Sequence, residues 1–137
     1  MRGRDFLVPA SELAQGRTEA HWRGAIVHAY YSLLLEGRDA LARWGRALPP
    51  HQNVHSYVRL CFVRAKDADL KRIGLKLEDL VKGRNAASYN LLPQALFASD
   101  NKALLSVQEA ADAVALLDAI DGDPARRAAA IASLPPP

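Results

Sequence analysis

The sequence predicts an all-α protein, an up-and-down bundle of four to five helices plus a short C-terminal helix. Apolar residues recur with the 3.6-residue period of an α-helix, and no segment alternates with the period of two that is typical of strands. Short connections between the helices favour antiparallel neighbours. Proline and glycine mark the breaks, at Gly16, Pro49-Pro50, Pro93 and Asp121-Gly122-Asp123-Pro124.

Five helices are expected before the last break, over about residues 9–15, 18–44, 51–65, 68–89 and 99–120. Thr18 suits an N-cap position, because its hydroxyl can accept a hydrogen bond from the first turn. We expect one domain over residues 1–137, with its core at about 5–120 and a short helix and Pro-rich tail at 121–137. In the fifth helix the stripe predicted to face the core is Leu104, Val107, Ala111, Val114 and Leu117.

The composition narrows the class of protein. Half of the residues are apolar, but no apolar run approaches the roughly eighteen residues that span a membrane. No apolar signal segment follows the N-terminal arginines, and the single cysteine, Cys61, excludes an internal disulfide. We therefore expect a cytoplasmic protein without membrane association. Residues 1–66 hold ten Lys/Arg against five Asp/Glu, which suits phosphates or an acidic partner but equally a solvated face.

Two segments carry the functional signal. Arg23 to Leu33 reads RGAIVHAYYSL on the second helix, and Gly83 to Tyr89 reads GRNAASY on the fourth. Adjacent helical positions differ by 100°, so Tyr30 is expected to point inward and Tyr31 toward the flank. Arg84 falls on the apolar face, where a guanidinium must be paired, reach the rim or face a partner.

These segments resemble the HEPN family of small all-helical domains. In that family a helix reading roughly R-x-A-I-x-x-A-Y-Y-A packs against a helix that ends in R-x-x-A-D-Y or R-x(4–6)-H. This chain resembles the first branch, with Ser88 in place of the aspartate, and the resemblance covers about residues 5–120. The resemblance implies a homodimer in which two copies of Arg84 meet across a two-fold groove. It also implies RNA as a ligand, a minimal nucleotidyltransferase as partner protein, and a role in a toxin–antitoxin or defence-type system.

The resemblance also implies a catalytic set. Ribonuclease members of the family combine an arginine, a polar neighbour and a histidine separated from the arginine by four to six residues, which suits a metal-independent endoribonuclease. Arg84 and Asn85 match the first two positions, but residues 89–91 are Tyr, Asn and Leu, so that Tyr89 stands where the histidine is expected. We therefore predict Arg84, Asn85 and Tyr89 as catalytic residues.

Four further residues are predicted to bind the substrate, namely Arg23, His28, Tyr31 and His55. If the chain cleaves RNA, either His28 or His55 is expected to carry the proton. His51 and His55 have a spacing that can chelate a metal, but no cysteine or H-E-x-x-H arrangement accompanies them. We expect neither a metal nor another cofactor.

Three alternatives stay open at this point. The chain can be a ribonuclease, an RNA binder that does not cleave, or a non-catalytic protein–protein interaction module in which the motif is a structural remnant. In the last case Tyr30 and Tyr31 serve packing, and Arg84 interacts with the last turn of its own helix.

Overall fold

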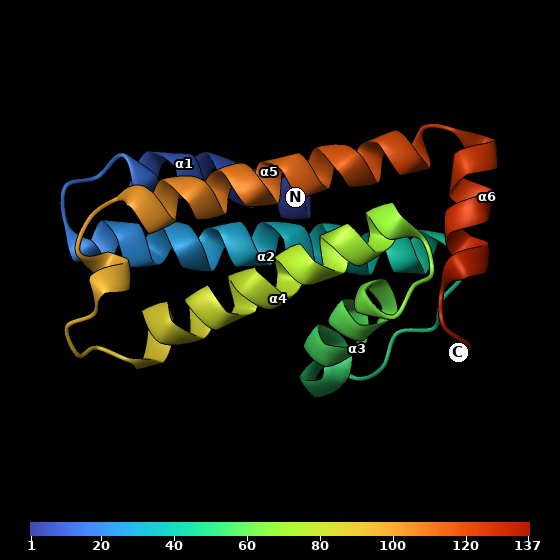
Figure 1. Ribbon diagram of the computed structural model, residues 1–137, viewed down its shortest axis with the longest axis horizontal. Helices are drawn as coiled ribbons and strands as arrows, with labels where there is room; N and C mark the ends of the chain where they lie inside the picture. Colours follow the sequence, from blue (N-terminus) through green and yellow to red (C-terminus); the bar gives the residue numbers. More distant parts are fainter.

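The computed structural model describes residues 1–137 and confirms the all-α fold class. Six α-helices and two short 3-10 helices follow one another along the chain (Figure 1). Their bounds are η1 Gly3–Phe6, α1 Leu7–Ala14, α2 Glu19–Arg43, α3 His51–Val63, α4 Ala68–Tyr89, η2 Ala95–Phe97, α5 Asn101–Asp121 and α6 Pro124–Ser133. The bounds of α4 are those expected, whereas α1 begins earlier than expected because a 3-10 turn leads directly into it.

Side chains cap three of these helices at their first turn. The Thr18 hydroxyl accepts a backbone hydrogen bond at the start of α2, which confirms the predicted N-cap. Asp67 and Asp123 do the same for α4 and α6 with their carboxylates. After α2, Gly45 takes a φ of 86°, in the left-handed region that glycine adopts without steric cost, and so ends the helix.

The three long helices α2, α4 and α5 run in alternating directions, and α6 lies across one end of the bundle (Figure 1). The short helix α3 packs against α4, and the closeness of this contact depends on Gly74. A Cβ atom at that position would lie 2.5 Å from the backbone nitrogen of Val63, so only glycine lets the two backbones approach this far. The contact fixes how α3 lies against α2 and α4.

Two clusters of buried side chains form the core. The larger has 22 buried residues from α2, α3, α4, α5 and α6 and their flanking segments, and the smaller has six, near the start of α2 and the end of α4. The larger cluster includes Ala130 and Leu134, so the core extends past the expected limit at residue 120.

The predicted inward stripe of α5 is wrong at Leu104, which is 45% exposed. The buried positions of α5 begin instead with Ala103, Ser106 and Ala110. These small side chains allow α5 to lie close to α2. Because they face α2, the helix is rotated about its axis relative to the prediction, and Leu104 points toward solvent.

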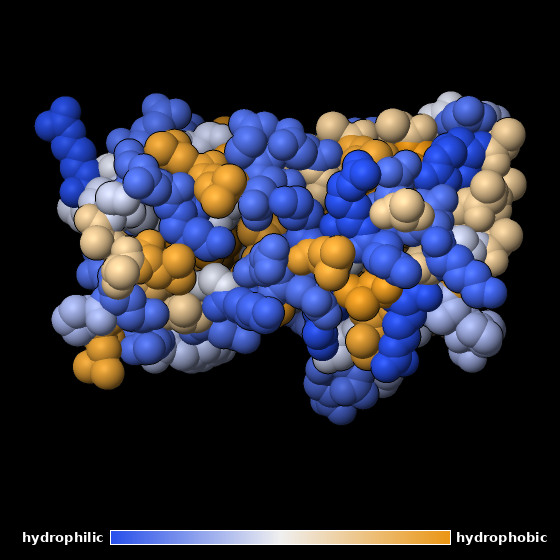
Figure 2. Space-filling model, viewed as in Figure 1, coloured by the Kyte–Doolittle hydropathy of each residue, from blue (hydrophilic) through white to orange (hydrophobic).

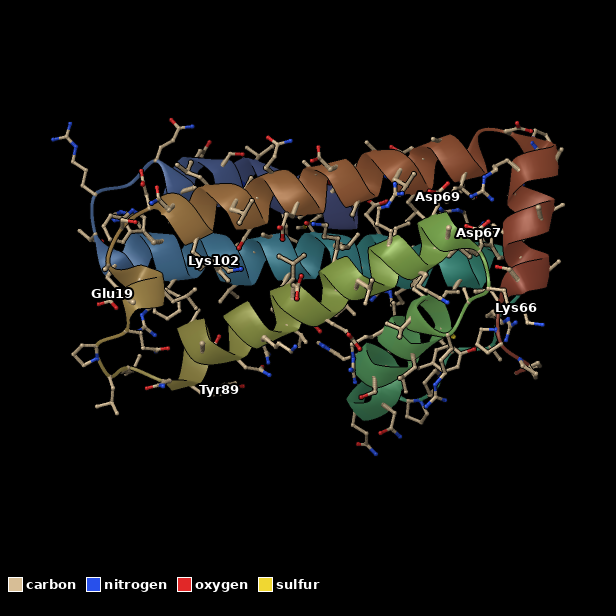
Figure 3. All side chains as sticks on the ribbon, in the orientation of Figure 1. Glu19, Lys66, Asp67, Asp69, Tyr89 and Lys102 are labelled. Carbon is tan, nitrogen blue, oxygen red and sulfur yellow. The ribbon has the colours of Figure 1, made fainter.

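Two arginine clamps hold the ends of the chain to the bundle. Arg4 near the N-terminus donates to Glu36 on α2 and to Asp118 on α5, and its side-chain hydrogen bonds lower the pKa of Glu36. Near the C-terminus, Arg126 of α6 pairs with Asp67 and Asp69 at the start of α4. Both aspartates lie beside α6 in Figure 3. Both clamps join segments that are far apart in sequence.

Polar side chains cover most of the face shown in Figure 2, with separate apolar side chains between them. No α-helix of the protein combines the length and the apolar character that a membrane span requires.

Candidate functional site

Helix α2 supplies two adjacent tyrosines near its middle. Tyr30 is 2% exposed and points into the core, whereas Tyr31 is partly exposed beside it, as their positions on the helix predict. The two rings meet edge to face with their centroids 5.2 Å apart. They form an aromatic floor from which only the hydroxyl groups offer polar contacts.

Arg84 from α4 lies against this floor. Its Nη2 donates to the Tyr31 hydroxyl at 2.8 Å, and its Nη1 donates to Oδ1 of the neighbouring Asn85 at 3.0 Å. The guanidinium carbon also lies 5.8, 5.6 and 5.5 Å from the ring centroids of Tyr30, Tyr31 and Tyr89. A partly buried cation is thus surrounded by three aromatic rings.

No carboxylate balances the charge of Arg84. It takes part in none of the ten ion pairs of the protein, and its buried Nε has no hydrogen-bond partner. Burial by itself lowers the pKa of the guanidinium, but the hydrogen bond to Tyr31 and the nearby tyrosines raise it, and the net shift is upward. The group therefore stays charged, and an anion is the ligand that suits it best.

Helix α3 adds a histidine to the same place. Nδ1 of His55 lies 2.8 Å from the Tyr30 hydroxyl, and the imidazole ring is perpendicular to the ring of Tyr31 at 6.0 Å. Burial, and then the positive charge of Arg84, lower the pKa of His55 below its ordinary 6.5. His55 is therefore neutral at neutral pH.

The bond between Tyr30 and His55 determines which imidazole nitrogen can meet a ligand. Burial raises the pKa of Tyr30 to about 12, so its hydroxyl keeps its proton at neutral pH. The hydroxyl can donate to Nδ1 or accept from it, depending on the tautomer. In either case Nδ1 is occupied and Nε2 is the nitrogen that can exchange a proton with a ligand.

The structure thus brings together five of the seven predicted site residues, and it adds one that the sequence analysis assigned to packing, Tyr30. We call this set the Arg84 cluster. It consists of Tyr30, Tyr31, His55, Arg84, Asn85 and Tyr89. The double tyrosine in the sequence already drew attention to Tyr30. Only the fold shows that the Tyr30 hydroxyl, which points inward, meets His55 from another helix.

The other two predicted binding residues lie outside the Arg84 cluster. Arg23 is 8% exposed, and its Nη1 donates to three backbone carbonyl oxygens at the end of α4. Its guanidinium also pairs with Glu19 and lies 4.1 Å from the centroid of the Phe97 ring. Arg23 therefore has a structural role at the junction of α2 and α4, and its predicted role in substrate binding stays a prediction.

His28 lies at the edge of the cluster without joining it. Its Nδ1 is 2.8 Å from the backbone oxygen of Gly24, within its own helix. Its ring packs beside Phe6, which in turn lies between His28 and Tyr31, with centroid distances of 5.6 and 6.5 Å. Of the two histidines considered as proton carriers, only His55 reaches the Arg84 cluster.

No cavity of the single chain includes Arg84, and the groove expected between two copies stays a prediction. The largest cavity, of about 410 Å³, lies between α4 and α5 and is lined by none of the cluster residues. The two smaller cavities do not include Arg84 either. The Arg84 cluster is instead a partly buried group of side chains at the junction of α2, α3 and α4.

No family model, no curated protein and no solved structure matches this chain.

Proposed function

We propose that the chain is a HEPN-like, RNA-associated module of a toxin–antitoxin or defence-type system, and that the Arg84 cluster binds an RNA phosphate. One observation carries the proposal: Arg84 is a partly buried cation with no carboxylate partner, and Nη1 and Nη2 each donate only one hydrogen bond inside the protein. The second N–H groups of Nη1 and Nη2 lie in the plane of the guanidinium, an arrangement that matches the oxygens of a phosphate. The resemblance of the two motif segments to the HEPN family supports the same ligand class.

The position of His55 supports cleavage as well as binding. With Nδ1 donating to Tyr30, Nε2 carries a lone pair and can take the proton of a ribose 2′-hydroxyl. The 2′-oxygen then attacks phosphorus, the bond from phosphorus to the 5′-oxygen breaks, and that oxygen takes a proton from solvent. Arg84 stabilises the charge that develops on the phosphate oxygens. His55 would thus replace the histidine that the motif lacks after Arg84.

Binding and cleavage of a labelled single-stranded RNA test the proposal. Arg84→Met removes the charge but keeps the length of the side chain, and Lys82→Met is its control because Lys82 is an exposed cation on the same helix. We expect Arg84→Met to weaken binding about tenfold or more, since a hydrogen-bonded charged contact contributes roughly 1.5–3 kcal/mol. His55→Gln should bind normally without cleaving.

Equal RNA affinity of the wild type, Arg84→Met and Lys82→Met would refute the proposal. Normal cleavage by His55→Gln would refute the role of His55 and leave binding at Arg84 intact. A binding constant that falls steeply with salt is expected, because phosphate contacts release counterions.

The proposal includes the assembly implied by the resemblance. Two copies of the chain would pair so that the two Arg84 side chains line one polar groove, and a minimal nucleotidyltransferase would be the partner protein. A partly buried arginine whose side-chain partners are a tyrosine and an asparagine, and not a carboxylate, is compatible with a symmetric interface. The solution mass of the purified chain tests the dimer, and a monomer under conditions where RNA binds would remove it.

A second function, protein–protein interaction without catalysis, is favoured by a different feature. The cavity between α4 and α5 has an apolar floor that includes Ile73 and Leu116, with Arg72, Lys76 and Asp112 among its polar lining residues. If this cavity serves a partner protein, Leu116→Lys should abolish the partner's binding while Arg84→Met leaves it unchanged.

A further inference from the structure

Tyr89 is the most exposed member of the Arg84 cluster. It is the last residue of α4 and 75% exposed, and Figure 3 shows it at the outer end of that helix. The Arg84 guanidinium lies over the Tyr89 ring at 5.5 Å from its centroid. The side chain is therefore in contact with the proposed phosphate site and at the same time open to solvent.

The backbone that carries Tyr89 is held firmly. Arg23 donates to the carbonyl oxygens of Ala86, Ala87 and Asn90, at 3.1, 3.1 and 2.7 Å, and these acceptors bracket Tyr89 along the chain. The side-chain amide of Gln94 donates to Asn90 O as well, at 3.0 Å. These bonds fix the end of α4, so an exposed ring is presented on a rigid backbone.

The surface next to Tyr89 is also apolar. Leu91 and Leu92 directly follow in the chain and are 78% and 71% exposed. Figure 2 shows apolar side chains projecting at the corner of the molecule where α4 ends in Figure 1. An aromatic ring with apolar neighbours beside a cation is the combination that binds a nucleobase next to its phosphate.

We propose that Tyr89 stacks on an unpaired nucleobase, so that the substrate of this site is single-stranded RNA. The inference rests on the proposed function, because Arg84 must hold the phosphate of the stacked nucleotide or of its neighbour. A base within a duplex is already stacked on both sides and cannot place a face against Tyr89 without leaving the helix. Every base has a face that can stack, so little sequence preference is expected.

Four variants and three probes test this inference in the full chain. The probes are a single-stranded RNA oligonucleotide, its perfect duplex, and an abasic single strand of equal length and charge. Tyr89→Leu removes the ring, Tyr89→Phe keeps it, and Arg84→Met and Lys82→Met serve as before. Because Tyr89 is exposed, neither substitution there should change the melting temperature.

We expect Tyr89→Leu to bind the single-stranded RNA about tenfold more weakly than the wild type, and Tyr89→Phe to bind it normally. The abasic strand should bind wild type and Tyr89→Leu equally, and the duplex should bind less tightly than the single strand. Arg84→Met should lose affinity for all three probes.

The outcomes separate the two proposals. If Arg84→Met binds the probes as well as the wild type, the proposed phosphate site fails and the stacking inference fails with it. If Arg84→Met loses binding while Tyr89→Leu keeps full affinity for single-stranded RNA, only the stacking inference is overturned. Equal binding of duplex and single strand would also overturn it.

Discussion

Two arginines on α2 and α4 lie near the same end of the bundle and differ in what surrounds them. Arg23 donates to three backbone carbonyl oxygens, pairs with Glu19 and lies over a phenylalanine ring. Arg84 reaches one tyrosine hydroxyl and the side chain of Asn85, and it has an unpartnered Nε. Both residues were predicted to belong to the site, but Arg23 has a carboxylate and three carbonyl oxygens as partners, whereas Arg84 has no carboxylate partner.

A structural arginine and a ligand-binding arginine can be distinguished by their partners. A buried charge is costly unless the protein satisfies it, so a guanidinium with all of its partners inside the fold stabilises that fold. A guanidinium without a counter-ion gains more from an anion than from its own protein. Substitutions of the two arginines should therefore affect different properties.

Arg23→Met should have the largest effect on stability. It removes the donor shared by three carbonyl oxygens at the end of α4 and leaves Glu19 without its partner. We expect a loss of roughly 3 kcal/mol in the free energy of unfolding, measured by urea denaturation. Arg17→Met, at an exposed arginine just before α2, is the control and should change stability little. A loss of under roughly 1 kcal/mol for Arg23→Met would contradict the structural role.

Tyr30→Phe should have a smaller effect, because it removes one hydrogen bond from the Arg84 cluster. The expected loss is about 1 kcal/mol. The variant also releases Nδ1 of His55, so the nitrogen chemical shifts of the imidazole should report a different ratio of its two tautomers. Unchanged tautomers would mean that the tyrosine packs against the histidine without orienting it.

A third prediction concerns the effect of pH on stability. The pKa of His55 is lower in the folded protein than its ordinary 6.5, so the unfolded chain takes up a proton first as the pH falls. Stability should therefore decrease as the pH falls from about 6.5 toward the folded pKa, and this contribution should be absent in His55→Gln. The lowered pKa values of Glu36, Asp67 and Asp121 act only at more acidic pH, where carboxylates titrate. An identical pH dependence in wild type and His55→Gln would contradict the prediction.

Much of the fold could be predicted from the sequence, because the helical period, the Thr18 cap and the glycine and proline breaks are local signals. The rotation of α5 about its own axis could not be predicted, since it depends on how small side chains such as Ser106 pack against another helix. Within the site, the phase of Arg84 indicated a partly buried cation. Contacts between segments distant in sequence turn Arg23 toward carbonyl oxygens and His55 toward Tyr30, so the sequence could not predict either orientation.

Arg84→Met should have the smallest effect on stability, and it tests whether Arg84 differs from Arg23 in its role. The methionine keeps contacts with the three tyrosine rings, while the cost of burying an unpaired charge disappears. We expect the free energy of unfolding to change by less than about 1 kcal/mol, in contrast to Arg23→Met. A fixed concentration of single-stranded RNA should raise the melting temperature of the wild type and of Lys82→Met more than that of Arg84→Met, because a ligand stabilises the folded state in proportion to how tightly it binds. A large loss of stability in Arg84→Met, with no change in RNA affinity, would show that Arg84 is a structural residue like Arg23.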